Sequence, residues 1–302
     1  MALEDMFKPV PGSRPEVACE IRPEGVVAAR SGKKSGEMVT AFAPLREGAI
    51  APGLKVPNLG DAHAVRTALE SVLESVSATK EVTLVVPDAA ARVLLLDFDE
   101  LPSKRQDALP VVRFRLRKMV PFDVETAAVS YQVMAEKNDL LSVLVTVMPG
   151  DVLEEYESVV REAGYEPGAV LPSTLAAAAA VQGDGATLMV NQSGGSVTTA
   201  VAQGNEMLLH RSMDLPVEAQ AREEEMAQAV ITALAWYEDT LKRLPSTMYY
   251  AGPGGANAAL QSRWATLVQP APRLVDLVAA ETSAMTSVPP GVMAGVMGAL
   301  AP

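Results

Sequence analysis

The stretch LPSKRQDALPVVRFRLRKMVPFDVETAAVSYQVM at residues 101–134, followed by LLSVLVTVMPGD at residues 140–151, decides the fold. It predicts a Pro-bounded basic helix over Ser103–Met119, which enters a Val-Pro-Phe-Asp turn. Apolar, β-branched runs then predict strands over Ala127–Ala135 and Leu140–Met148. A further helix opens at Asp151 and stops at Gly164. The stretch contains no catalytic motif, so its information lies in this order of elements.

A meander of three short strands occurs twice along the chain. Each time, tight turns join the strands, and a helix and another strand follow. The first meander is predicted over Val17–Ile21, Val26–Arg30 and Glu37–Pro44, and the second over Thr187–Val190, Ser196–Ala202 and Met207–Arg211. Two such halves are typical of a duplicated α/β protein with two lobes.

The composition excludes several classes of protein. The chain has 302 residues, of which 49% are apolar and 21% charged, which is typical of a globular protein. A formal net charge of −12 argues against nucleic-acid binding, which needs a surplus of Lys and Arg. Cys19 is the only cysteine, so no intrachain disulfide forms. We find no signal peptide, and the apolar segment Val288–Pro302 is too interrupted by Pro and Gly to span a bilayer. We therefore expect a cytoplasmic protein with no transmembrane segment of its own.

The order of elements in Leu101–Gly168 resembles the PilM-like proteins of type IV pilus assembly, which are actin-like proteins of the bacterial cytoplasm. The cytoplasmic domain of GspL-like proteins of type II secretion is similar enough to be a second reading. The resemblance implies an α/β, actin-like (ribonuclease-H-like) fold with two lobes and an inserted small subdomain. We expect a flexible arm over residues 1–15 and an N-terminal lobe over 16–172, with the inserted subdomain at about 83–140. The C-terminal lobe is expected over 173–302, with its last helix packing back on the N-terminal lobe.

The first hairpin departs from the pattern of the family. In the actin-like superfamily the nucleotide sits between the lobes, held by two hairpins and a Gly-rich turn. Relatives have Asp-Ile-Gly-Ser-Ser-Ser in the first hairpin, where this chain has Glu20 for the Asp, Arg22 for the Gly and Pro23 for the first Ser. Proline removes an N–H donor, and arginine adopts a glycine conformation only at a cost. The substitutions favour a structural hairpin over a phosphate-binding one.

The second hairpin and the Gly-rich turn keep more of the pattern. Asn191 stands where relatives have an Asp, and an amide carries no charge to help fix a divalent cation. Two readings of Ser193, Gly194 and Gly195 stay open, an anion-binding turn and a plain turn. The turn with Gly252, Gly254 and Gly255 resembles the adenosine-side turn of the family and is the best preserved of the three; the alternative is a tight turn needed for packing alone. We expect a degenerate site with no catalytic residue, no metal and no cofactor, and weak binding of ATP with magnesium at most.

A basic stripe marks the predicted helix in an otherwise acidic chain. It consists of Lys104, Arg105, Arg113, Arg115, Arg117 and Lys118. Most such stripes are solvated helix faces, and the alternative is a surface for an acidic segment or membrane headgroups. The resemblance implies a partner, a PilN-like bitopic inner-membrane protein, whose short cytoplasmic peptide docks between subdomains of the N-terminal lobe. We place that contact at Arg113, Arg115, Arg117 and Phe122. The pilus ATPases are further candidate partners.

The resemblance implies a non-catalytic cytoplasmic scaffold of a type IV pilus or type II secretion-like machine, held at the inner membrane by its partner. The alternative is an active ATPase or small-molecule kinase of the same superfamily. That alternative needs a carboxylate near the γ-phosphate, and Glu20 is the only candidate in the hairpins. An FtsA-like filament former is a third reading. It would need an amphipathic membrane-binding tail, whereas Met293–Pro302 has no basic residue.

Overall fold

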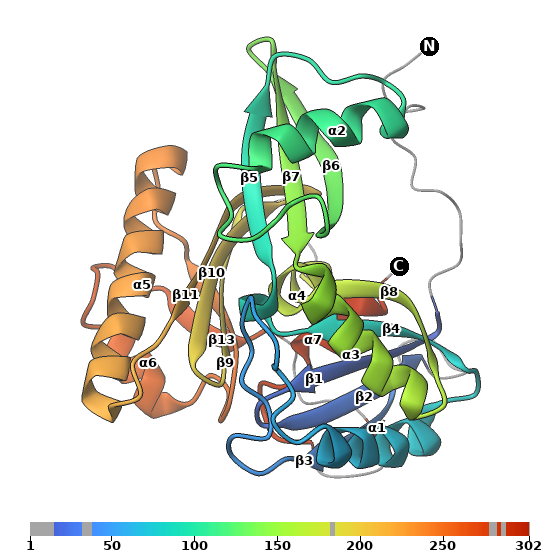
Figure 1. Ribbon diagram of the computed structural model, residues 1–302. Helices are drawn as coiled ribbons and strands as arrows, with labels where there is room; N and C mark the ends of the chain where they lie inside the picture. The colour runs from blue at the N-terminus through green and yellow to red at the C-terminus, as the bar shows by residue number, and fades with distance from the viewer. Residues whose placement is uncertain (1–14, 32–37, 182–184, 278–282, 285–287, 302) are drawn as a thin grey trace.

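The computed structural model describes residues 15–31, 38–181, 185–277, 283–284 and 288–301 (Figure 1). The arm expected over residues 1–15 lies outside this part, apart from Pro15. The described residues form three β-sheets, one in each lobe and one in a small subdomain inserted within the N-terminal lobe. Their helices cover the outer faces of the sheets, and α4 (Ser173–Ala178) and α7 (Ala294–Ala299) lie near the centre (Figure 1).

The N-terminal lobe contains a mixed six-stranded sheet in the order β14-β3-β2-β1-β4-β8. Its strands are β1 (Val17–Arg22), β2 (Gly25–Ser31), β3 (Met38–Pro44), β4 (Glu81–Val86), β8 (Glu166–Pro172) and β14 (Ser283–Ala284). The strands β1, β2 and β3 form the predicted antiparallel meander, and β1, β4 and β8 run parallel. The parallel strands therefore end at one edge of the sheet.

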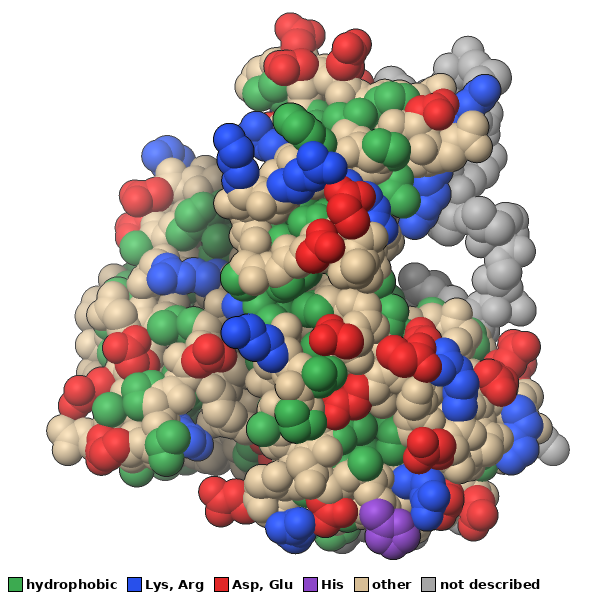
Figure 2. Space-filling model, viewed as in Figure 1, with side chains coloured by type: hydrophobic (Ala, Val, Ile, Leu, Met, Phe, Trp, Pro, Cys, Tyr) green, Lys and Arg blue, Asp and Glu red, His purple; other side chains and the backbone are tan. Residues whose placement is uncertain are grey.

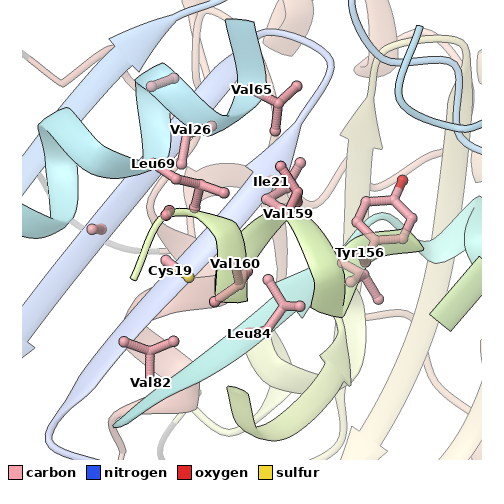
Figure 3. Packing of buried hydrophobic residues seen from close by; sticks show 14 of the residues in the cluster. Cys19, Ile21, Val26, Val65, Leu69, Val82, Leu84, Tyr156, Val159 and Val160 are labelled. Atoms are coloured by element: carbon pink, nitrogen blue, oxygen red, sulfur yellow. The ribbon is translucent and has the colours of Figure 1, made fainter. Parts of the chain in front are cut away.

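Two amphipathic helices, α1 (Ala62–Val76) and α3 (Gly150–Glu162), cover one face of this sheet. The helix α1 begins at Asp61, whose side chain accepts a hydrogen bond from the Ala64 N–H. Apolar side chains at helical spacing on both helices meet those of the strands in one core. Figure 3 shows this packing for Cys19, Ile21, Val26, Val65, Leu69, Val82, Leu84, Tyr156, Val159 and Val160. Burial raises the pKa of the Cys19 thiol to about 12.

The inserted subdomain has different bounds from those expected. It is an antiparallel sheet in the order β5-β7-β6, formed by β5 (Arg92–Phe98), β6 (Ala128–Lys137) and β7 (Leu140–Met148), with α2 (Arg105–Leu116) on one face. Because β4 pairs with β1 and β8, the separate sheet spans residues 92–148 rather than about 83–140. The runs that form β4 and β5 are both apolar and β-branched, so their composition does not show which sheet each one joins.

The C-terminal lobe contains a five-stranded sheet in the order β11-β10-β9-β12-β13. Its strands are β9 (Thr187–Ser193), β10 (Ser196–Gln203), β11 (Glu206–Asp214), β12 (Thr247–Ala251) and β13 (Arg273–Asp276). The helices α5 (Ala219–Leu241) and α6 (Ala258–Trp264) pack on one face. The other face meets the inserted subdomain, where Met189 and Met207 pack with Leu95 and Leu144.

The helices α4 and α7 cross between the lobes and pack tightly on each other. A Cβ atom on Gly298 would lie 1.8 Å from the Ala176 carbonyl oxygen, so only glycine allows the backbones to come this close. The helix α7 also buries Val296 and Ala299 against β1 and β2, so the end of the described chain packs on the N-terminal sheet. Within the described ranges, we find no helix with the length and hydropathy needed to cross a membrane.

Candidate functional site

A cluster of buried polar side chains lies at the carboxyl ends of the parallel strands β1, β4 and β8. Because these strands are parallel, Glu20, Asp88 and Ser173 come together at their carboxyl ends. The Ser173 hydroxyl donates to Glu20 Oε1 at 2.6 Å, and the Thr174 N–H donates to Asp88 Oδ1 at 2.9 Å. This edge faces the C-terminal lobe.

Asn191 of β9 connects that lobe to the cluster. Its Nδ2 donates to Ser173 Oγ at 3.0 Å and to Thr174 Oγ1 at 2.9 Å. These bonds join residues 17 and 18 positions apart in sequence. The same Nδ2 also lies 3.4 Å from Asp88 Oδ2 of the N-terminal lobe, so this amide donates a hydrogen bond between the lobes, which a carboxylate could not do.

Arg22 is a fully buried cation at the end of β1. Its guanidinium donates to Glu20 Oε1 at 2.9 Å, to Glu24 Oε2 at 3.3 Å and to the Gln192 carbonyl oxygen at 2.9 Å. Burial disfavours its charge, but Glu20 and Glu24 outweigh burial and raise the pKa of Arg22. Burial raises the pKa of Glu20, and Arg22 opposes this effect. The guanidinium is thus held by two carboxylates and by the second hairpin.

The turns of the two hairpins contact each other directly. The Gly194 N–H donates to Glu24 Oε1 at 2.6 Å. Gly194 has a φ of +53°, and a Cβ atom there would lie 2.7 Å from Cγ of Pro23, so both the conformation and the contact require glycine. The backbone donor that an anion would need at this turn already serves a carboxylate of the protein.

The Gly-rich turn after β12 is covered by another part of the chain. Gly254 and Gly255 have positive φ values of +80° and +63°. A Cβ atom on Gly291 would lie 1.9 Å from the Gly252 carbonyl oxygen, and Pro290 approaches Gly255. The segment that leads into α7 therefore packs on this turn.

Three buried polar atoms of the site, Glu20 Oε2, Asn191 Oδ1 and Ser193 Oγ, have no hydrogen-bond partner among the described residues. The backbone of α7 closes over the first of them, since a Cβ atom on Gly295 would lie 2.3 Å from Glu20 Oε2. In the same described ranges, no three His, Cys, Asp or Glu side chains are grouped to hold a metal ion. A triphosphate needs several free N–H donors and space between the hairpins. The residues that meet here do not fit such a group.

Sequence reasoning missed Glu24, Asp88, Ser173 and Thr174 as residues of this site. A signal existed for the last three, because each follows a buried strand of the parallel set. His210 of β11 lies near Asp88 of this site. Its side chain is half-buried with Nε2 inside the protein, and this burial lowers its pKa while Asp88 partly opposes that shift.

The four residues expected to contact a partner have different roles. Arg113 is directed inward, with its guanidinium donating to the Val124 and Ala127 carbonyl oxygens, the latter at 3.0 Å. Arg117 pairs with Glu125 at 2.7 Å. Phe122 is half-buried in the core of the inserted subdomain.

Arg115 is exposed and lines an open depression of about 370 Å³ beside α2. The other lining residues are Asp97, Phe98, Asp99, Glu100 and Val111. The same helix exposes 72% of Phe114, which the sequence analysis did not single out. Figure 2 shows Lys and Arg side chains around apolar ones over this subdomain.

No protein-family model matches the sequence, and no curated protein matches it. Solved structures do match. A chain of the PilM-PilN type IV pilus biogenesis complex has a TM-score of 0.76 at 15% identity, covering 96% of this chain and 100% of that one. The cytoplasmic domain of EpsL, an inner-membrane component of the type II secretion system of Vibrio cholerae, has a TM-score of 0.51 at 15% identity, covering 94% and 92%. The ethanolamine utilization protein EutJ from Carboxydothermus hydrogenoformans has a TM-score of 0.50 at 12% identity, covering 99% and 94%. The predicted fold is confirmed: this chain has the two-lobed, actin-like α/β fold, and its structure resembles that of the PilM-PilN chain over nearly its whole length.

Proposed function

We propose that this chain is a non-catalytic, nucleotide-independent scaffold of a type IV pilus or type II secretion machine, located on the cytoplasmic side of the inner membrane. The observation that carries the proposal is the direct bonding between the turns of the two hairpins, through Glu24 and Gly194. The similarity to a chain of the PilM-PilN complex supports the choice of machine.

The contacts of Glu20 argue against the alternative of an ATPase or small-molecule kinase. A catalytic carboxylate must be free to orient a water or a hydroxyl group next to the γ-phosphate. Oε1 of Glu20 accepts bonds from Arg22 and Ser173, and Oε2 is covered by Gly295 of α7. Turnover would require the hairpins to separate and this carboxylate to exchange its partners.

We further propose that the partner is a PilN-like bitopic membrane protein, whose short cytoplasmic peptide binds beside α2. Exposed Phe114 and Val111 provide apolar contacts, and the depression next to them has an acidic rim that includes Asp97, Asp99 and Glu100. Cytoplasmic segments next to a membrane span are rich in Lys and Arg. A peptide with an apolar anchor complements Phe114 and Val111, and basic residues next to the anchor complement the three carboxylates of the rim, which outnumber Arg115 in the same depression. We propose no surface for the pilus ATPases.

Calorimetry with the cytoplasmic peptide of the bitopic protein from the same organism tests the partner. We expect binding, and at least a roughly tenfold loss of affinity in Phe114→Ala and in Asp99→Lys, since a central aromatic anchor contributes about 1–2 kcal/mol or more. Val217→Ala is the matched control, because Val217 is 93% exposed at another surface. Unchanged affinity in both variants would place the peptide elsewhere.

Thermal denaturation with ATP and magnesium tests nucleotide independence separately. Phosphates would have to displace Glu24 from Gly194 and lie beside buried Glu20. We therefore expect no shift in Tm at micromolar ATP. A clear stabilisation at that concentration would show that the cleft binds nucleotide and would overturn this part of the proposal.

A further inference from the structure

We propose that Glu24 is a resident substitute for a phosphate: its carboxylate occupies an anion site formed by the Gly194 N–H and the Arg22 guanidinium. It thereby bonds the two lobes to each other without a ligand. The inference deepens the proposed nucleotide independence and rests on it.

The contacts of Glu24 are those that a bound anion would make. Oε1 lies 2.6 Å from the Gly194 nitrogen and Oε2 lies 3.3 Å from Nε of Arg22, so one backbone donor and one guanidinium hold the two oxygens. Glycine turns with positive φ and arginine side chains are both common ligands of phosphate groups. The carboxylate therefore has donors suited to a phosphate oxygen.

The balance of charge explains why the protein excludes a free anion here. Arg22 stands between two carboxylates, those of Glu20 and Glu24, so these three side chains together carry a formal net charge of −1. An incoming phosphate would add negative charge beside Glu20, which is fully buried. Removal of the Glu24 carboxylate leaves a neutral pair, Glu20 with Arg22, and one free N–H donor at Gly194. That arrangement is ready to receive an anion.

The site is accessible once the side chain is shortened. The Glu24 side chain is 22% exposed, whereas those of Arg22 and Glu20 are 1% and 0% exposed. The space vacated by Glu24 thus connects with solvent. The site also lies between the lobes, because Glu24 is in the β1–β2 turn of the N-terminal lobe and Gly194 is in the β9–β10 turn of the C-terminal lobe. Any anion bound there would restore a contact between the hairpins.

The test is chemical rescue of the full-length Glu24→Ala variant by inorganic phosphate, followed by thermal denaturation at constant ionic strength. We expect the variant to have a lower Tm than the wild type. We also expect about 10 mM phosphate to raise the Tm of the variant by roughly 2–4 °C, for an anion with a millimolar Kd, without raising that of the wild type. Glu47→Ala is the matched control, because it removes an exposed carboxylate. Its Tm should equal that of the wild type both without and with phosphate.

Two results would overturn the inference. One is a phosphate response of Glu24→Ala no larger than that of the wild type, and the other is an unchanged Tm on removal of the carboxylate. Glu24→Gln retains nearly the same shape and keeps the measurement possible if the alanine variant fails to fold. We expect a lower urea midpoint and no phosphate response for Glu24→Gln, and an unchanged midpoint would equally contradict the role of the charge. Stabilisation of the wild type by ATP is a different outcome, which would refute the proposed function.

Discussion

Replacement of Arg22 by Met tests the energetic role of the buried cation between the hairpins. The side chain of Arg22 is 1% exposed, and its loss leaves Glu20, at 0% exposure, without an opposing charge. Removing one member of a buried ion pair costs about 3–5 kcal/mol. Since the free energy of unfolding of a domain is about 5–15 kcal/mol, Arg22→Met is expected to lose a large fraction of it.

Urea denaturation at about pH 7 measures this loss. Arg30→Met is a matched control, because Arg30 is half-buried and, among the described residues, its guanidinium donates to the Val76 carbonyl oxygen at 2.6 Å. We expect the control to cost about 1 kcal/mol. The double variant Glu20→Gln with Arg22→Met should lose clearly less free energy of unfolding than the sum of the two single variants, because both members of the buried pair are then uncharged.

The dependence on pH gives a second readout of the same variant. Burial raises the pKa of Glu20, and without Arg22 the main opposing influence is lost. An acid with a raised pKa stabilises the fold below its unfolded pKa, and this contribution is lost as pH rises. The loss in free energy of unfolding caused by Arg22→Met should therefore become smaller as the pH is lowered towards about 5, by up to ~1.4 kcal/mol per pH unit. If Arg22→Met lost no more free energy of unfolding than Arg30→Met at any pH, the reasoning would be refuted.

Two further predictions concern other parts of the fold. Burial lowers the pKa of His210, so the unfolded chain binds more protons and stability is lost as pH falls below about 6.5. Urea midpoints at several pH values should show that His210→Gln reduces this loss, with exposed His63→Gln as the control; an unchanged pH profile would contradict the prediction. Gly298→Ala should lower stability by about 1–3 kcal/mol or more in thermal denaturation, because its Cβ atom would overlap the Ala176 carbonyl oxygen. Gly53→Ala, where a Cβ atom meets nothing within 4 Å, should cost much less, and equal losses would exclude the steric explanation.

The elements with strong periodicity were predictable from the sequence. The meander of the N-terminal lobe and the strands β6 and β7 lie where alternation and turn residues placed them. The start of the inserted subdomain was not predictable, because β4 and β5 have the same kind of composition and differ only in their pairing partners.

The candidate site was predictable only in part. Residue identities at Arg22 and Pro23 indicated that the first hairpin had lost its phosphate-binding pattern. The contact between Glu24 and Gly194 joins positions 170 residues apart, and only the packing of the lobes brings them together. The inward direction of Arg113 likewise depends on the loop that carries Val124, and the periodicity of the helix alone does not predict where that loop lies.

Alkylation of Cys19 can measure local opening of the N-terminal sheet at β1. The thiol lies on β1, one residue before Glu20, at 0% exposure, and burial holds its pKa at about 12. A thiolate is the reactive form, so alkylating reagents cannot modify the native protein until β1 leaves its neighbours. The sequence contains no second cysteine, and the rate of labelling therefore follows one event. Without any engineered probe, that rate would reveal whether a partner or a solute loosens or tightens the strand that carries the buried charges.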